Sequence, residues 1–180
     1  MGVNADRFIL LDRDGVINED RPGSVRSESD FVLLPHAPEA IAELNDKGYH
    51  VLVVTNQACV GRGELAPDEL ERIHDSMLRT VRAAGGDIER IYVCPHTDED
   101  GCNCRKPRPG LLTKAQRDFG FEPSQSWMIG DARRDIEAAR SAGVRPALVR
   151  TDQKAPDRTP YGVPVYDDLM HFARDISSIA

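Results

Sequence analysis

The segment FILLDRDGV, residues 8–16, decides the fold of this chain. Four apolar residues end abruptly in Asp12 and Asp14, and a glycine follows. Residues i and i+2 of an extended chain point the same way, so both carboxylates can face one site just beyond a buried strand. An Asp-rich turn at a strand end would give the same pattern. The chemistry at the other strand ends therefore decides between these interpretations.

Length and charge limit the classes of protein to consider. The chain has 180 residues, 40% of them hydrophobic, and a net charge of −7. We expect one domain over residues 1–180, with a core over about 7–150 and a C-terminal loop and short helix over 151–180. The charge disfavours nucleic acid and anionic membranes as partners. Without an apolar run long enough for a membrane span or a secretion signal, the sequence predicts a cytoplasmic protein, which we expect to be a monomer.

Short apolar runs alternate with helical patterns along the chain. Predicted strands cover residues 8–11, 50–54, 91–94, 127–130 and 147–149. Predicted helices cover residues 38–47, 67–84, 111–119, 136–141 and 167–177, and a loop over 151–164 should wrap the sheet edge. This alternation predicts a Rossmann-like three-layer α/β/α fold, with a central, mainly parallel sheet of about five strands. The connections are too short for a sizeable cap domain.

Polar residues follow several of the predicted strands. The second strand ends in Thr55, the fourth in Asp131 with Asp135 four residues later, and Lys106 follows the third after a cysteine-rich loop. Ligands of such sheets bind beyond the carboxyl ends of the strands. In isolation each residue could be a strand-end hydroxyl, a solvated charge or a helix cap. Together they predict a site for phosphoryl transfer on Mg²⁺, which prefers hard oxygen ligands.

Each residue of this predicted site has an expected role. Asp12 and Asp131 would supply carboxylates to Mg²⁺, Asp14 its backbone carbonyl, and Asp135 would support them. The free oxygen of Asp12 would attack phosphorus and form an aspartyl-phosphate. Asp14 would protonate the leaving alkoxide and later activate water. Two catalytic residues, Thr55 and Lys106, would neutralise charge on the phosphoryl oxygens.

A second group of residues lies in CPHTDEDGCNC, residues 94–104. Three thiolates and one imidazole form the ligand set of a closed, structural zinc site, supplied here by Cys94, His96, Cys102 and Cys104. The alternative is a cluster of reduced thiols in a loop. Because Lys106 follows the last ligand closely, zinc would fix the loop that carries a catalytic lysine.

The motifs DRDGV, VVTN, RKP and GDARRD, in this order, resemble the four motifs of the haloacid dehalogenase superfamily of phosphatases. With the zinc ligands before RKP, the chain resembles the small capless members that act on heptose bisphosphate or histidinol phosphate. NQACVGRG and CRKPRPG are more similar to the D-glycero-D-manno-heptose 1,7-bisphosphate 7-phosphatases. The first loop differs, since residues 20–25 read DRPGSV where those enzymes usually carry a His-Gly-Tyr-like stretch.

This resemblance implies hydrolysis of the 7-phosphate, with Asp12 as nucleophile and Asp14 as acid and base. It also implies substrate contacts at Asp20, Arg21, Pro22, Gly23, Thr55, Asn56, Gln57, Ala58, Arg105 and Lys106. Arg105 would clamp the distal part of the substrate through a bidentate fork. The alternatives are a histidinol-phosphate or other small sugar-phosphate phosphatase, and a non-enzymatic, zinc-stabilised binding module.

Overall fold

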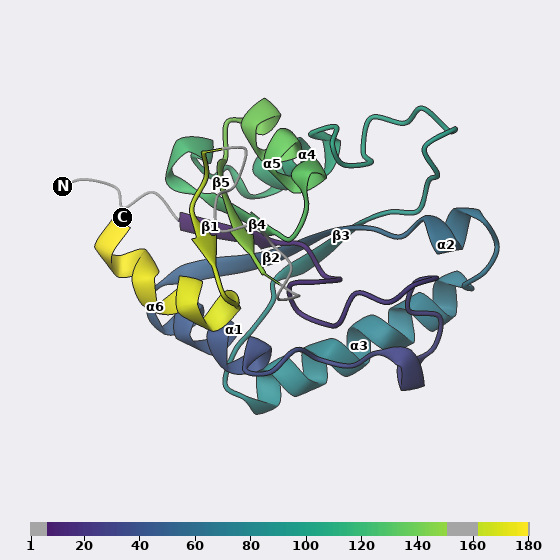
Figure 1. Cartoon of the computed structure of the whole chain (residues 1–180), viewed down its shortest axis with the longest axis horizontal. Helices are drawn as coiled ribbons and strands as arrows, with labels where there is room; N and C mark the ends of the chain where they lie inside the picture. The colour runs from purple at the N-terminus through teal and green to yellow at the C-terminus, as the bar shows by residue number, and fades with distance from the viewer. Residues whose placement is uncertain (1–6, 151–161, 180) are drawn as a thin grey trace.

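A computed structural model describes residues 7–150 and 162–179, with side chains up to residue 176 in the last helix. Its centre is a six-stranded sheet in the order β3-β2-β1-β4-β5-β6, and every neighbouring pair is parallel (Figure 1). The strands are β1 Arg7–Leu11, β2 Tyr49–Asn56, β3 Arg90–Cys94, β4 Trp127–Gly130, β5 Arg145–Val149 and β6 Val165–Tyr166. The sequence predicted about five; the sixth has two residues, too few for a recognisable pattern.

Helices cover both faces of the sheet, which confirms the three-layer α/β/α prediction (Figure 1). One face carries α1 Ala37–Asp46, α3 Pro67–Ala83 and α6 Leu169–Ile179, and the other carries α4 Gly110–Phe119 and α5 Arg133–Ala142. Single turns complete the fold: α2 Ala58–Gly61, η1 Glu28–Asp30 and η2 Pro123–Gln125. Outside the packed helices, the connections after β1 and β2 hold only η1 and α2, so no cap domain is present in residues 7–150.

The position of β1 explains its unbroken apolar run. Ile9 and Leu11 pack toward α1, α3 and α6, while Phe8 and Leu10 pack toward α4 and α5. A strand covered on both faces needs apolar residues at successive positions. Its end is held by a hydrogen bond from the Asp12 N–H to the Ile129 carbonyl (2.9 Å). Asp12 therefore lies near the middle of the carboxyl edge of the sheet.

Local capping explains where two helices start. Asp135 accepts a hydrogen bond from the Ala132 N–H, so α5 begins at Arg133, before the predicted start at residue 136. Asp168 caps the His171 N–H, and α6 begins at Leu169, two residues after the predicted start. Most of the predicted loop 151–164 lies outside the described residues. In the described ranges, no helix has the length and apolar character needed to cross a membrane.

Candidate active site

Three carboxylates meet at the carboxyl edge of the sheet, beyond β1 and β4. Oxygens of Asp12, Asp131 and Asp135 lie within 4.8 Å of one another. Oδ1 of Asp131 is buried and has no hydrogen-bond partner among the described residues. Acidic oxygens gathered in this way, one of them lacking a donor, fit a hard divalent cation such as Mg²⁺. The structure thus brings together the two carboxylates that the sequence assigned to the metal, Asp12 and Asp131, and the Asp135 carboxylate that it assigned a supporting role.

Gly15 makes room for this cluster. Its φ is +82°, a conformation that glycine adopts without strain. A Cβ at this position would lie 2.3 Å from Oδ2 of Asp131, far inside van der Waals contact. The glycine of the DRDGV motif therefore allows the loop after β1 to pass directly against the carboxylate from the end of β4.

Burial makes these carboxylates costly to ionise without a cation. It raises the pKa of Asp12 to about 7, although Lys106 acts in the opposite direction. Burial and the neighbouring Asp135 carboxylate raise the pKa of Asp131 to about 6. A divalent cation beside them would favour the ionised forms that a nucleophile and a metal ligand require.

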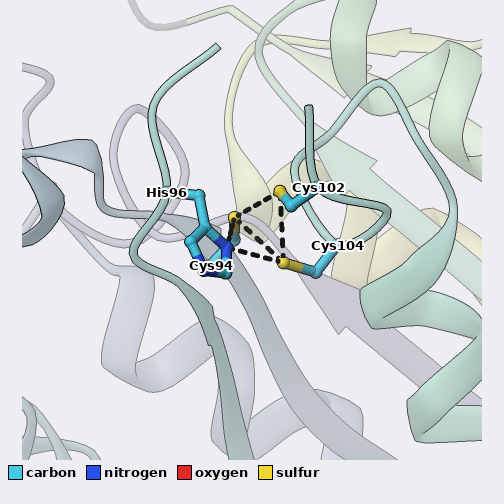
Figure 2. A group of neighbouring side chains, drawn as sticks. All are labelled: Cys94, His96, Cys102 and Cys104. Atoms are coloured by element: carbon cyan, nitrogen blue, oxygen red, sulfur yellow. Dashed lines mark hydrogen bonds between the residues drawn. The ribbon is translucent and has the colours of Figure 1, made fainter. Parts of the chain in front are cut away.

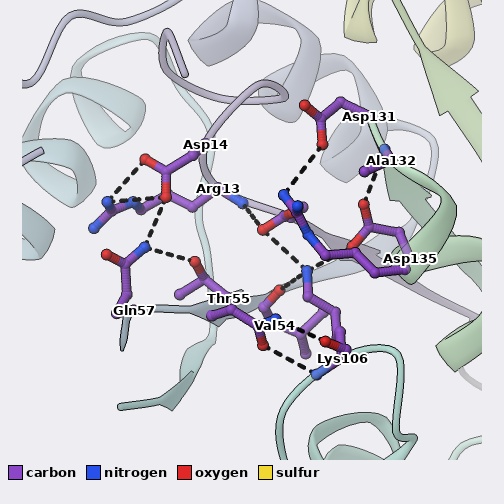
Figure 3. Close-up of polar contacts among 12 residues, drawn as sticks. Arg13, Asp14, Val54, Thr55, Gln57, Lys106, Asp131, Ala132 and Asp135 are labelled. Atoms are coloured by element: carbon purple, nitrogen blue, oxygen red, sulfur yellow. Dashed lines mark hydrogen bonds and ion pairs between the residues drawn. The ribbon is translucent and has the colours of Figure 1, made fainter. Parts of the chain in front are cut away.

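Lys106 provides the buried positive charge of the site (Figure 3). Its Nζ lies 3.0 Å from Oδ1 of Asp12 and 2.7 Å from Oδ1 of Asp135, and donates to the Val54 carbonyl at 2.8 Å. Burial alone would lower the pKa of Lys106, but the two carboxylates outweigh it and raise the pKa. The lysine is therefore charged and fixed by three contacts. Only one of them is to the predicted nucleophile.

The backbone of Lys106 is held by Asn56 at the end of β2. The Asn56 amide donates to the Lys106 carbonyl (3.0 Å) and accepts from the Lys106 N–H (3.1 Å). This reciprocal pair uses the side-chain amide that the sequence assigned to substrate. Asn56 thus joins the end of β2 to the loop that carries the lysine.

Asp14 lies across from the carboxylate cluster and has its own set of donors (Figure 3). Arg13 Nη2 contacts both its oxygens (2.9 and 3.1 Å), Asn18 Nδ2 donates to Oδ1 (2.9 Å), and Gln57 Nε2 donates to Oδ2 (2.7 Å). The same Gln57 nitrogen lies 2.8 Å from Thr55 Oγ1. Burial would raise the pKa of Asp14, but Arg13 and the hydrogen bonds lower it. Asp14 is thus oriented by protein groups and leaves the metal cluster to the other carboxylates.

The four predicted zinc ligands converge at the end of β3 and in the loop after it (Figure 2). Five of the six pairs among their sulfur and Nδ1 atoms lie 3.2 to 3.7 Å apart, and all four atoms lie within 4.8 Å of one another. A tetrahedron with Zn–S bonds of about 2.3 Å has ligand atoms about 3.8 Å apart, so these side chains need only small shifts to hold zinc. The site residues are Cys94, His96, Cys102 and Cys104, and the three cysteines are unbridged.

Known proteins match this chain over most of its length. A family model described as HAD-hydrolase-like matches residues 103–171. The D-glycero-beta-D-manno-heptose-1,7-bisphosphate 7-phosphatase of Neisseria meningitidis is 40% identical over 94% of both chains, and that of Pseudomonas aeruginosa is 39% identical over 90% of this chain and 93% of the other. A crystal structure of the D,D-heptose 1,7-bisphosphate phosphatase from B. bronchiseptica, complexed with magnesium and phosphate, has a TM-score of 0.90 and 36% identity, covering 97% and 99% of the two chains.

The chain belongs to the haloacid dehalogenase-like phosphatases. This agrees with the sequence-based prediction of that superfamily. The relatives are named phosphatases, which decides against the alternative of a non-enzymatic binding module.

Two substrate-binding predictions for this HAD-like phosphatase fall on side chains with protein partners. Arg105 donates from Nε to Asp98 Oδ1 (2.7 Å) and from Nη2 to Oδ2 (3.4 Å). Its guanidinium fork therefore holds a carboxylate of the zinc loop, and a substrate phosphate would have to displace it. The Arg21 guanidinium lies 3.5 Å from Asp30, in η1.

The remaining predicted substrate residues of the phosphatase are on loops at the same edge. Asp20 is close enough to affect the pKa of Asp131 and Arg134. Pro22 and Gly23 are exposed on the loop that follows. Ala58 begins α2 and is half-buried. Asp20, Pro22, Gly23 and Ala58 stay predicted substrate contacts.

Sequence reasoning missed four charged or polar side chains of the phosphatase site. Arg134 Nη2 lies 3.9 Å from Asp12 Oδ2 and 3.8 Å from Asp131 Oδ1. Its place next to Asp135 in GDARRD was the available signal. The other three are Arg13 and Asn18, which contact Asp14 directly, and His74, which contacts Arg13. Of these, His74 had no local signal, because only the fold brings α3 to this loop.

Proposed function

We propose that this phosphatase removes the 7-phosphate of D-glycero-D-manno-heptose 1,7-bisphosphate with Mg²⁺, through an aspartyl-phosphate on Asp12. Relatives at up to 40% identity carry that name, and the B. bronchiseptica enzyme was crystallised with magnesium and phosphate. One observation carries the chemistry: the two oxygens of Asp12 face different cationic positions. Oδ1 is held by Lys106 and the Arg13 N–H, while Oδ2 lies 3.9 Å from Nη2 of Arg134, which also lies 3.8 Å from Asp131 Oδ1.

The metal would be held by Asp12 and Asp131 through carboxylate oxygens and by Asp14 through its backbone carbonyl, with Asp135 in support. Bound Mg²⁺ would neutralise the carboxylates and the phosphate oxygens. Lys106, Thr55 and the Arg13 backbone N–H are the protein's own donors at this edge. Zinc at the loop after β3 would be structural, since four protein ligands fill a tetrahedral shell.

In the first step, a carboxylate oxygen of Asp12 attacks phosphorus and the bond from phosphorus to the sugar oxygen breaks. Because its donors hold the pKa of Asp14 below the usual range, Asp14 must take up a proton from solvent or substrate in the substrate complex, and it then gives this proton to the departing alkoxide. Lys106 remains paired with Asp135, which keeps the ammonium at the reacting group when Asp12 becomes esterified. In the second step, water attacks the aspartyl-phosphate and Asp14 takes the proton. Inorganic phosphate leaves and the Asp12 carboxylate is restored.

Arg105 and the loop over residues 20–23 are proposed to contact the distal part of the substrate. Asp98, which is paired with Arg105 in the structure, would release the guanidinium when a phosphate binds. The single domain, the cytoplasmic location and the monomeric state expected from the sequence stay predictions.

A substrate panel with Asp12 variants tests this function. The panel holds the heptose bisphosphate, histidinol phosphate, other sugar phosphates and p-nitrophenyl phosphate, each with Mg²⁺. We expect a kcat/KM for the heptose bisphosphate at least roughly tenfold above the others, a difference of about 1.4 kcal/mol in transition-state binding. Asp12→Asn should abolish phosphate release while circular dichroism stays unchanged. A smaller preference would contradict the substrate, and residual turnover of a few per cent would contradict the nucleophile.

A further inference from the structure

Arg13, between the two aspartates of the motif, has a fully buried side chain. Its Nη2 contacts both oxygens of Asp14, and its Nη1 lies 3.2 Å from Nε2 of His74. The guanidinium carbon also lies 5.8 Å from the centre of the Phe31 ring. Nε is buried without a hydrogen-bond partner among the described residues. Among the described residues, the buried guanidinium of Arg13 therefore donates its hydrogen bonds to two side chains, Asp14 and His74.

His74 takes part in this contact as an acceptor. A guanidinium can only donate, so Nε2 must present its lone pair to Arg13 Nη1 and the ring proton must be on Nδ1. Burial, helped by the charge of Arg13, lowers the pKa of His74 to about 3, which agrees with a neutral ring. The residue lies on the buried face of α3, far from Asp14 in sequence. The fold thus supplies one remote acceptor to the arginine of the motif.

We propose that His74 is a positioning residue that holds the Asp14 carboxylate through Arg13. The inference rests on the proposed function, because it takes Asp14 to be the acid and base. Of the groups facing Asp14, Asn18 lies on the same loop and Gln57 follows β2. Arg13 alone contacts both oxygens, so its direction sets the plane of the carboxylate.

The loss of the His74 acceptor would leave an N–H of a buried arginine unpaired. Such a group costs free energy until it finds another acceptor or reaches water. With Nε already unpaired, the guanidinium would rotate or move, and the contact of Nη2 with both oxygens of Asp14 would change. A shift of about 1 Å in a catalytic group is enough to lower a rate roughly 10²-fold.

Leaving-group dependence separates this role from general damage to the fold. A sugar alkoxide leaves poorly unless an acid protonates it, whereas p-nitrophenolate leaves without that help. A misplaced Asp14 should therefore lower kcat/KM, which reports formation of the aspartyl-phosphate, much more for the sugar phosphate than for the aryl phosphate. The later hydrolysis, in which Asp14 acts as base, is common to both substrates and does not enter kcat/KM. Damage to packing or to the Asp12 region should slow both substrates alike.

His74→Asn and His74→Gln make a matched pair. The Gln side chain reaches the position of Nε2 and keeps an acceptor there, while Asn is too short. With Mg²⁺ present, we expect His74→Asn to lower kcat/KM roughly 30- to 100-fold for the heptose bisphosphate and less than about threefold for p-nitrophenyl phosphate. His74→Gln should stay within about threefold of the wild type for both. Met77→Leu, a buried change one turn further along α3, controls for packing and should not alter the ratio of the two rates.

Equal losses on both substrates in His74→Asn, or no loss on either, would overturn the inference. Asp14→Asn separates this failure from that of the proposed function. If Asp14→Asn is selective for the sugar phosphate and His74→Asn is not, only the role of His74 is wrong. If Asp14→Asn lowers kcat/KM equally for both substrates, the acid role of Asp14 is wrong and the inference falls with it.

Discussion

Lys106 Nζ lies 3.0 Å from Oδ1 of Asp12, and the two side chains are 0% and 4% exposed. The same ammonium lies 2.7 Å from Asp135. Two buried carboxylates thus share one buried cation. Because Asp12 and Asp135 are buried away from water, removal of the Lys106 ammonium leaves both carboxylates without a compensating charge.

Lys106→Met should therefore destabilise the protein and abolish turnover. We expect the free energy of unfolding to fall by about 3 to 5 kcal/mol, since a buried charge loses its partner. Chemical denaturation at pH 7 measures this loss. Lys114→Met removes an exposed lysine paired with Asp118 on α4, and should leave unfolding unchanged. If Lys106→Met/Asp135→Asn is no more stable than Lys106→Met, charge compensation is not the cause.

The pH dependence of stability should report the raised carboxylate pKa values. Consider a carboxyl group whose pKa is higher in the folded state than its unfolded value of 3.8. Its contribution to stability is fully present below pH 3.8. This contribution is lost as the pH rises through the folded pKa, about 6 for Asp131 and about 7 for Asp12. Without Mg²⁺, stability from these groups should therefore decrease between about pH 4 and 7.

Asp131→Asn tests this pH dependence. A pKa raised from 3.8 to about 6 corresponds to about 3 kcal/mol against the ionised folded form. Thermal unfolding at pH 8 without Mg²⁺ should show a higher Tm for Asp131→Asn than for the wild type. Added Mg²⁺ should raise the wild-type Tm and have little effect on the variant. A lower Tm in the variant at pH 8 would show that the carboxylate stabilises the fold there.

The sequence predicted the parts of the site that are local in the chain. The sequence shows the apolar run before Asp12 and the Cys and His spacing because each lies within a few residues. It also shows the polar residues at each strand end, because each follows its strand directly. The partners of those groups were not visible. Asn56 holding the Lys106 backbone and His74 holding Arg13 depend on how distant elements pack. Arg105 could in principle pair with any of several acidic residues, and only the folded structure shows that its partner is Asp98.

Zinc removal should loosen the loop that carries Lys106. Cys104→Ser takes away a ligand two residues before that lysine, and we expect a lower zinc content, a lower Tm and a lower kcat. Structural zinc sites contribute folding free energy directly, so the Tm loss should be several degrees or more. Cys59→Ala, at a buried cysteine outside the cluster, should keep one zinc per chain by metal analysis. Full activity in zinc-free Cys104→Ser would contradict the positioning role.

Arg134 should compete with Mg²⁺ for the carboxylates. Its Nη2 lies within 3.9 Å of Asp12 and Asp131, the residues proposed to bind the metal. Its side chain is 43% exposed, so solvent screens the charge and Arg134→Gln should tighten the Mg²⁺ Kd only about three- to tenfold. Isothermal titration with Mg²⁺ measures this change. Arg133→Gln is the control, because it removes the same charge from the neighbouring arginine, which is bound to Glu137. If Arg133→Gln tightens Mg²⁺ binding to a similar extent, the effect is due to net charge alone.

Gly15→Ala and Gly120→Ala separate backbone strain from a clash at the metal site. Both glycines have positive φ, +82° and +72°, so each alanine pays a similar conformational cost of about 1 kcal/mol. At Gly120 a Cβ meets nothing within 4 Å, whereas at Gly15 it would lie 2.3 Å from Asp131 Oδ2. We therefore expect Gly15→Ala alone to displace that carboxylate, weaken Mg²⁺ binding at least tenfold and lower kcat/KM, an effect of about 1.4 kcal/mol or more. Equal Mg²⁺ affinity in the two variants, measured by titration, would show that the loop after β1 can move away from Asp131 without harm to the site.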